Sequence, residues 1–393
     1  MNNNTSYKNN LVFIAAYIGM LTFGISMTSI GAILPNIVEK FSLSGYSAGA
    51  IVSLLPLGIL AGSLTFGPIV DRYGYKFLLI ICSFLVIAGL YGIAVAESFI
   101  FLQAAILIIG IGGGVINGGT NALVADIAGD AKGSKLSFLG IFYGIGALGL
   151  PVILGFLSGS FGNRDILTAV SLFLLLLLII IMLIKFPPPK QPQGFPIKEG
   201  IKLFNNPVLL LFGFFLFFQS GIEGIANNWT TSYIRNYLMV SQEKSLFALT
   251  YLVLALTVTR LILSYVLKTL PRSYVIFMSL IIVSIGSLIL YTGGNYVFAV
   301  IGLIFYGIGF AAGFPVILSF VADKFSSLSG TAFSLVFVIA LTGNTALNYF
   351  TGALSEVFGI RYFTIVILFC AIIMALIFFY LQRKALLKDP ELK

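Results

Sequence analysis

Long apolar runs alternate with short polar joints along almost the whole chain. Each run is long enough to cross about 30 Å of hydrocarbon as a helix. Twelve runs lie near residues 11–34, 46–70, 75–95, 98–125, 134–158, 165–186, 207–234, 245–268, 272–292, 295–322, 329–351 and 361–382. The first run has no cationic leader and no small-residue cleavage site, so we expect it to remain as a span. The pattern predicts an all-α polytopic membrane protein with 12 transmembrane helices.

The longest polar joint is rich in proline and separates the sixth run from the seventh. A proline-rich segment of this kind is expected to be an extended linker. We therefore expect an N-terminal six-helix bundle over 1–186, a cytoplasmic linker over 187–204 and a C-terminal six-helix bundle over 205–393.

The two halves repeat each other at a constant offset of 197 residues. The stretch Gly155–Arg164 aligns with Gly352–Arg361 and keeps Gly, Leu, Ser, Phe, Gly and Arg in place. At the same offset Gly110-Ile-Gly matches Gly307-Ile-Gly, and Val124-Ala-Asp matches Val321-Ala-Asp. Because each half holds an even number of spans, the two six-helix repeats are parallel, and such a duplication favours a substrate cavity between them.

Composition and charge agree with a membrane protein and give its orientation. The chain is 59% hydrophobic and 9% charged, which excludes an ordinary soluble domain. Of the Lys and Arg residues, sixteen fall in the expected inner segments and five in the outer ones. This asymmetry predicts a multi-pass protein of the cytoplasmic (inner) membrane with both termini cytoplasmic. The net charge of +9 thus reports topology and requires no nucleic-acid partner, and two cysteines within spans suggest no disulfide framework.

The tract Gly67-Pro-Ile-Val-Asp-Arg-Tyr-Gly-Tyr-Lys76 resembles the signature loop of the major facilitator superfamily. Together with 12 spans in two halves, the resemblance covers the whole chain and implies the major facilitator fold. It implies that a gating loop of Gly67, Asp71, Arg72, Gly74 and Lys76 acts as an ionic latch that favours the outward-open state. Asp71 could engage the positive N-terminal end of a neighbouring helix. The alternative is a merely solvated charged turn.

Within that superfamily, two tracts resemble the bacterial fucose, galactose and glucose:proton symporter group. They are Glu223 to Ile234, with its glutamate, tryptophan and tyrosine, and the glycine-rich Phe142 to Pro151. The resemblance implies proton-coupled sugar transport. The first span lacks the carboxylate that several proton–sugar symporters carry there, so any coupling would depend on Glu223.

Glu223 is the only carboxylate well inside a span. Such groups are costly in hydrocarbon and usually functional, so we expect Glu223 to bind and release the coupling proton. The alternative is a glutamate that only hydrogen-bonds a neighbour or the substrate. Arg260 is the only cation within a span. Its long stem allows it to reach the cytoplasmic surface, and an ion pair or gating role is the alternative.

Amide and aromatic side chains inside the spans could bind a sugar, since sugars need paired donors and acceptors with flat apolar surfaces. The candidates are Gln219, Asn117, Asn121, Asn227, Asn228, Trp229, Tyr143, Asn344 and Asn348. The alternative for each amide is a bridge between helices, worth about 1 kcal/mol. We expect about half of these residues to contact substrate, with Gln219, Asn117 and Asn121 ahead of Asn344 and Asn348.

These patterns predict a secondary active transporter and not an enzyme, since the chain has no histidine and only one deep acid. The expected mechanism is alternating access by a functional monomer in the lipid bilayer. The expected activity is proton-coupled symport of a sugar or similar small neutral polyol, with sodium as the other coupling ion considered and no cofactor. The alternative is a drug or metabolite exporter, or a glycolipid flippase, because the tract Gly146–Gly155 partly resembles the fifth-helix motif of antiporters.

Overall fold

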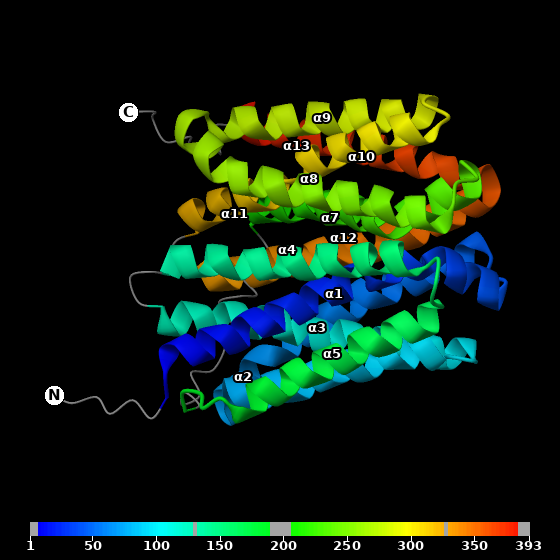
Figure 1. Cartoon of the computed structure of the whole chain (residues 1–393). Coiled ribbons are helices and arrows are strands. Elements are labelled where there is room, and N and C mark those ends of the chain that lie inside the picture. The colour runs from blue at the N-terminus through cyan, green and yellow to red at the C-terminus, as the bar shows by residue number, and fades with distance from the viewer. Residues whose placement is uncertain (1–6, 129–131, 189–205, 326–328, 384–393) are drawn as a thin grey trace. The chain divides into compact units, whose positions relative to one another are not determined.

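The computed structural model describes residues 7–128, 132–188, 206–325 and 329–383, and these form helices joined by short turns (Figure 1). The helices are α1 (Asn9–Phe41), α2 (Gly45–Val95), α3 (Phe99–Ile127), α4 (Lys132–Leu157), α5 (Asn163–Leu183), α7 (Pro207–Ser232), η2 (Tyr233–Tyr237), α8 (Gln242–Thr269), α9 (Arg272–Thr292), α10 (Tyr296–Phe310), α11 (Gly313–Lys324), α12 (Ser329–Phe358), η4 (Ile360–Tyr362) and α13 (Phe363–Arg383). Within the described residues, 12 helical stretches are long and apolar enough to cross a membrane. The predicted number of spans is confirmed.

Helix boundaries depart from the apolar runs where local backbone geometry decides. Helix α2 covers the second and third spans, and its backbone leaves helical geometry between them at Gly74, whose φ is 80° and ψ 166°. Glycine adopts this positive φ at no steric cost. The tenth span shows the opposite, because α10 ends at Phe310 and α11 begins at Gly313 inside the single apolar stretch Tyr296–Val321. The tenth span is therefore a broken helix.

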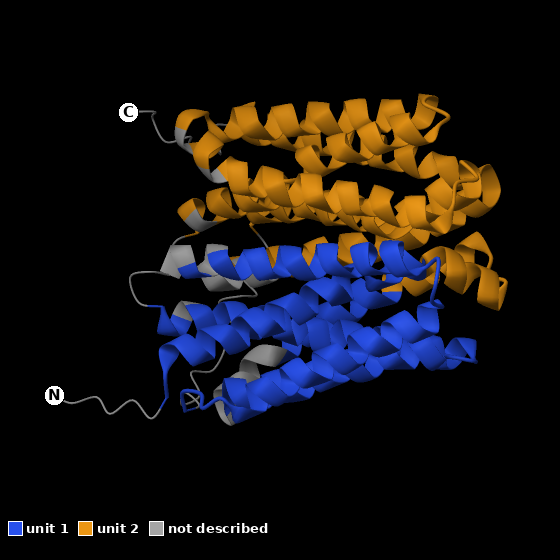
Figure 2. Ribbon diagram, in the orientation of Figure 1, with its two compact units in different colours: residues 1–33, 54–195 blue, residues 34–53, 196–393 orange. Residues whose placement is uncertain are grey.

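The chain divides into two compact units, and each is described by itself (Figure 2). The first contains 1–33 and 54–195, and the second contains 34–53 and 196–393. The end of α1 and the beginning of α2 thus belong with the C-terminal helices, although the expected N-terminal bundle included them. The predicted linker 187–204 lies almost entirely outside the described residues.

Close glycine contacts explain why 34–53 belongs to the second unit. A Cβ atom on Gly49 would lie 2.8 Å from the Cα atom of Gly352, so α2 and α12 cross with almost no space between their backbones. The backbone N–H of Gly45 donates to Glu356. Glu39 at the end of α1 forms a salt bridge of 2.7 Å with Arg235 in η2. These contacts join the ends that the charge asymmetry predicts to lie outside.

Small residues also set the packing inside each unit. In the first unit, α1 crosses α4 closely at Gly24, where a Cβ atom would lie 2.8 Å from the backbone nitrogen of Ala147. In the second unit, α7 presents Gly221 and Gly224 to Leu347 and Asn344 of α12. Close approach through small residues is the usual way in which membrane helices associate.

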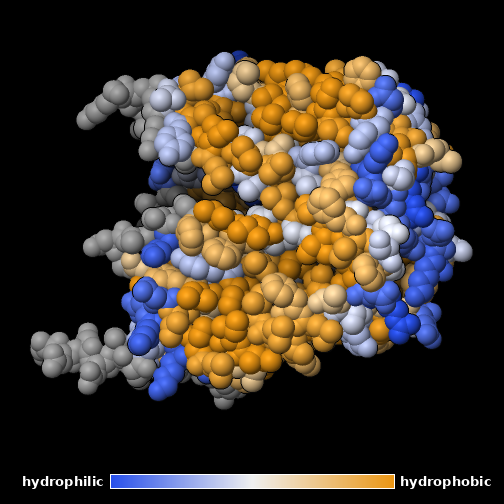
Figure 3. All heavy atoms as spheres, viewed as in Figure 1, coloured by the Kyte–Doolittle hydropathy of each residue, from blue (hydrophilic) through white to orange (hydrophobic). Residues whose placement is uncertain are grey.

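The outer surfaces of the helices suit a hydrocarbon environment. On the face seen in Figure 3, apolar side chains cover the helix centres and hydrophilic side chains gather toward the helix ends. Exposed side chains include Leu172, Leu176, Ile281 and Phe369, all more than half exposed. An apolar belt of this kind is expected where lipid replaces water as the solvent.

Candidate functional site

The carboxylate of Glu223 on α7 has a charged and a neutral partner. Gln219, one helical turn earlier, donates from Nε2 to Oε1 of Glu223 at 2.7 Å. Arg260 on α8 places its Nη2 atom 3.5 Å from Oε2 of Glu223. The side chain of Glu223 is 17% exposed and that of Arg260 is 33% exposed. A partly buried ion pair therefore joins two membrane spans.

The guanidinium of Arg260 has donors left over. An arginine carries five N–H donors, and one of its nitrogens faces Glu223. The Nε atom is buried, and within the described part of the chain it has no hydrogen-bond partner. In the structure the Arg260 side chain thus lies against the carboxylate and keeps donors that a ligand could use.

The break in the tenth span holds Gln219 in place. Because the helix is interrupted after Phe310, the Phe310 carbonyl is free to accept a bond from Nε2 of Gln219 at 3.1 Å. A Cβ atom on Gly313 would collide with the amide of Gln219, so only glycine leaves room for it. Both hydrogens of the amide nitrogen are used, and the side chain is buried. In this structure Gln219 positions Glu223 and offers its Nε2 atom to no other group.

Phe310 and Gly313 are site residues that the sequence interpretation missed. The cluster Gly307, Gly309, Gly313 and Pro315 in the tenth span was a signal for them, since glycine and proline together favour an interruption. The carbonyl released by that interruption is invisible in a list of polar side chains. Reading polar residues alone therefore underestimates the site.

Four polar residues form a buried ladder between α7 and α12. Asn228 donates from Nδ2 to Oδ1 of Asn348 at 3.1 Å. Asn348 donates to Oδ1 of Asn344 at 2.8 Å, and Asn344 donates to the carbonyl of Ser220 at 2.9 Å. Asn228, Asn344 and Asn348 are buried. This geometry is that of a bridge between helices, which was the alternative considered for each amide.

Asn227 and Trp229 lie on the same helix and differ in how their polar atoms are satisfied. Asn227 donates from Nδ2 to the backbone carbonyl of Glu223 at 2.8 Å. Trp229 is buried, and its indole Nε1 has no hydrogen-bond partner within the described residues. Buried donors are nearly always paired, so an unpaired indole is a specific candidate for contact with a ligand.

The candidates in the first unit are Asn117 and Asn121 on α3 and Tyr143 on α4. Asn121 donates from Nδ2 to Oδ1 of Asn117 at 3.2 Å, and Asn121 is exposed. The ring of Tyr143 lies 5.7 Å from that of Phe23 on α1. The structure therefore brings the two asparagines together on one face of α3, as their spacing predicts.

The structure does not describe the surroundings of Gly67 or the side chains of Asp71 and Arg72, so the ionic latch stays a prediction. Of that loop, Gly74 forms the bend of α2, and Lys76 is half-buried. Next to the bend, Tyr75 donates its hydroxyl to Oδ2 of Asp126 at 2.5 Å.

The second unit has a counterpart to the Tyr75–Asp126 bond. There, Arg272 donates to Oδ2 of Asp323 at 2.7 Å. Tyr75 and Arg272 are 197 residues apart, as are Asp126 and Asp323. The two repeats thus tether corresponding pairs of helices, α2 with α3 and α9 with α11, at corresponding positions with different donors.

Comparison with protein families gives one family for nearly the whole chain. The sequence model of the Major Facilitator Superfamily matches residues 16–339 and 224–392 of this chain. Among solved structures, a crystal structure of the nucleoside transporter NupG superposes with a TM-score of 0.76 at 17% identity, covering 96% of this chain and 100% of that one. A D-xylose-proton symporter superposes with a TM-score of 0.77 at 16% identity, covering 93% and 97%. At these identities the structures support the fold.

Curated relatives match in part and differ in activity. The multi-drug resistance efflux pump PmrA of Streptococcus pneumoniae is 26% identical over 52% of this chain and 53% of its own. The arabinose-proton symporter of Escherichia coli is 29% identical over 39% of this chain and 32% of its own. The sodium-dependent glucose transporter 1 of Rattus norvegicus is 29% identical over 36% and 29%. The matched segments span about half or less of these relatives.

Proposed function

The chain belongs to the major facilitator superfamily, and from this premise we propose that it is a proton-coupled symporter of a sugar or similar small neutral polyol. It is a transporter and not an enzyme. We place it in the cytoplasmic membrane with both termini inside, working as a monomer by alternating access. The proposal rests on one observation, the ion pair of Glu223 and Arg260 between α7 and α8.

The ion pair links proton binding to ligand binding. A carboxylate inside a membrane protein is tolerated when it is paired, and removal of its charge frees the partner. When Glu223 takes up a proton, Arg260 loses its counter-charge, and its N–H donors become available to the hydroxyl groups of a solute. Release of the proton restores the pair. Solute and proton then favour the same state of the site, and this is the linkage that symport requires.

Other side chains of the chain suit a neutral polar solute. The unpaired indole of Trp229 offers a donor and a flat apolar surface, the combination by which proteins hold sugars. Independently of this pair, Asn117 and Asn121 present amide groups on one face of α3 in the first unit. The arabinose-proton symporter and the sodium-dependent glucose transporter are sugar carriers by name, which supports this solute class and leaves both ions to be tested.

The test is uptake into proteoliposomes that contain the purified protein. A panel of labelled monosaccharides is offered with a proton gradient or a sodium gradient imposed separately. We expect accumulation of one or more sugars under the proton gradient only. Glu223→Gln should keep counterflow exchange of the sugar and lose accumulation. Failure of every sugar to accumulate under either gradient would refute the symporter.

A second function is favoured by the match to PmrA, which covers half of this chain. An exporter would use the same pair in exchange, with the proton entering as a hydrophobic cation leaves. In the same vesicles, an inward proton gradient would then drive loss of a preloaded dye such as ethidium. Gradient-driven dye movement without sugar uptake would replace the first proposal by this one.

A further inference from the structure

The two repeats carry the same arginine at the same place and use it differently. Arg164 and Arg361 are 197 residues apart, each just after the Gly-x-Leu-Ser-x-x-Phe-Gly pattern. In the second unit, Nε of Arg361 donates to the carbonyl of Tyr291 at 2.8 Å, and a second nitrogen donates to the same oxygen. The Arg361 guanidinium also stacks 4.1 Å from the centre of the Tyr291 ring. Arg361 is thus satisfied inside its own unit.

Arg164 in the first unit is left open. It lies in the first turn of α5 and is exposed. Among the described residues, no hydrogen bond or ion pair involves its guanidinium. At the repeat offset, Ala94 occupies the position that corresponds to Tyr291. Ala94 has no ring on which the Arg164 guanidinium could stack. The charge is therefore available to a group outside the chain.

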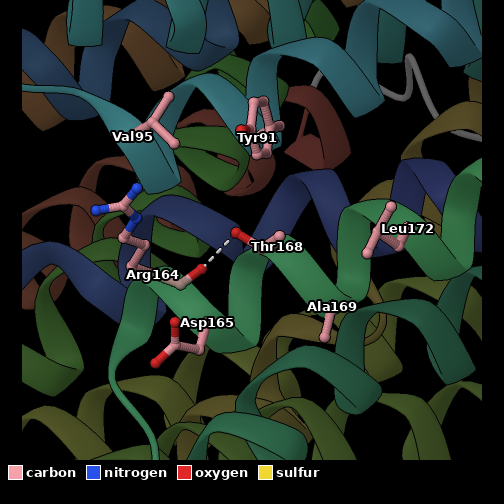
Figure 4. Close-up of a pocket in the computed structure, with 7 residues that line it drawn as sticks. All are labelled: Tyr91, Val95, Arg164, Asp165, Thr168, Ala169 and Leu172. Carbon is pink, nitrogen blue, oxygen red and sulfur yellow. Dashed lines mark hydrogen bonds between the residues drawn. The ribbon is translucent and has the colours of Figure 1, made fainter.

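Arg164 lines an open pocket of about 330 Å³ between α2 and α5. Tyr91 and Val95 come from the end of α2, and Asp165, Thr168 and Leu172 come from α5 (Figure 4). Figure 4 shows the guanidinium turned toward Val95, with Tyr91 opposite Thr168. Thr168 donates its hydroxyl to the carbonyl of Arg164 at 2.7 Å, so it fixes the helix turn and leaves the guanidinium unengaged.

The pocket changes from polar to apolar in the direction that a lipid would require. Val95 is the last residue of one span and Asn163 the first of another, so the pocket mouth lies at a membrane boundary. Leu172 lies about 12 Å further along the helix axis from Arg164, at 1.5 Å per residue, and is 58% exposed. Charged groups at the boundary and apolar groups toward the bilayer centre match a headgroup followed by an acyl chain.

We propose that this pocket binds a zwitterionic phospholipid, with its phosphate on Arg164, its ammonium group on Asp165 and an acyl chain over Leu172. A guanidinium matches a phosphate with two parallel hydrogen bonds. Asp165, the next residue of α5, also lines the pocket, and its negative charge opposes a purely anionic headgroup and favours one that carries an amine. The site is independent of which solute is transported, because it lies on the outer face of α2 and α5 within the first unit.

The test measures lipid retained by the purified full-length protein in detergent, by native mass spectrometry. Phosphatidylethanolamine and phosphatidylglycerol are titrated in competition. We expect phosphatidylethanolamine to bind in preference. Arg164→Gln should bind it about tenfold more weakly, a change of about 1.4 kcal/mol. Asp165→Asn should shift the preference toward phosphatidylglycerol.

Arg361→Gln is the matched control, because it removes the same charge at the repeat-related position. It should leave lipid retention unchanged, whereas equal losses in the two arginine variants would overturn the site. A preference of the unchanged protein for phosphatidylglycerol would also overturn it, as would displacement of the lipid by millimolar inorganic phosphate. A photoreactive phosphatidylethanolamine should cross-link within 164–172, and labelling spread evenly over the spans would contradict the proposal.

Discussion

The ion pair of Glu223 and Arg260 should contribute measurably to stability, and a double-mutant cycle can isolate its contribution. The three variants are Glu223→Gln, Arg260→Gln and the combination. At an effective dielectric of about 20, unit charges 3.5 Å apart attract by about 5 kcal/mol. Desolvation opposes this, and the side chains are 17% and 33% exposed, so we expect a coupling energy of about 2 kcal/mol. The stability losses of the two single variants should therefore add up to more than the loss in the double variant.

The measurement is thermal unfolding of the detergent-purified protein at a fixed scan rate. For a chain of 393 residues, a coupling energy of about 2 kcal/mol corresponds to a non-additive shift in Tm of about 2 °C. Acid that protonates Glu223 should remove the non-additivity, since only the charged form attracts Arg260. Additive shifts at neutral pH, or a coupling that acid leaves unchanged, would show that the two charges do not interact in the folded protein.

The control is the salt bridge of Glu39 and Arg235, which lies in the same unit. Its charges are closer, at 2.7 Å, but the side chain of Glu39 is 71% exposed. Exposed pairs are worth about 0.5 kcal/mol because water screens them. The shorter pair should thus give the smaller coupling. The opposite ranking would refute the reasoning from burial.

Three further predictions concern glycines and amides. Gly313→Ala should displace Gln219 and reduce transport at least about tenfold, because the new methyl group meets the side-chain amide of Gln219. Gly149→Ala is the control and should leave transport intact, because nothing lies within 4 Å of its added Cβ. Asn348→Ala should lower the free energy of unfolding by about 2 kcal/mol, because the Nδ2 of Asn228 and the Oδ1 of Asn344 lose their partner. Asn121→Ala should instead reduce sugar uptake with little change in Tm. A reversed pattern would exchange the roles given to the two helices. Gly49→Val should separate α2 from α12, because the added side chain meets the backbone of Gly352. A cysteine introduced at Ser53, one turn further along α2, should then react faster with a water-soluble maleimide. An unchanged reaction rate would refute the tight crossing.

The fold followed from the sequence because its causes are local and repeated. Apolar length alone predicts each span, and the offset of 197 residues predicts the duplication. The sequence interpretation grouped the segment 34–53 with its neighbours in the chain, in the N-terminal bundle. Its contacts group it with the C-terminal helices. Contacts between α2 and α12 depend on glycines that are 303 positions apart, Gly49 and Gly352. No local pattern announces such a pairing.

The sequence singles out the two charged residues but not their pairing, since the favoured interpretation took Arg260 to the cytoplasmic surface and the structure has it against Glu223. Glu223 and Arg260 stand out because charged groups within spans are rare. The partners of Gln219 were not visible, since one of them is a backbone carbonyl released by a break in a helix. Asn344 and Asn348 look the same in sequence as Asn117 and Asn121, with the same spacing. They differ because α12 packs on α7, and the environment decides whether an amide bridges helices or faces outward.

Under the proposed symport, the repeat makes the charged pair an element of one half only. At the repeat offset, Gln219, Glu223 and Arg260 correspond to Thr22, Ser26 and Ser63 in the first unit. Thr22 and Ser26 donate their hydroxyls to carbonyls of their own helix at 3.0 and 2.9 Å. These hydroxyls are small, neutral and already satisfied, so that unit has nothing to titrate at these positions. A symporter built from two equal halves needs its proton on only one of them, because protonation of one half suffices to bias the equilibrium between two states. The second unit alone carries this element, and a single substitution at Glu223 should therefore remove coupling while leaving the helices that move intact.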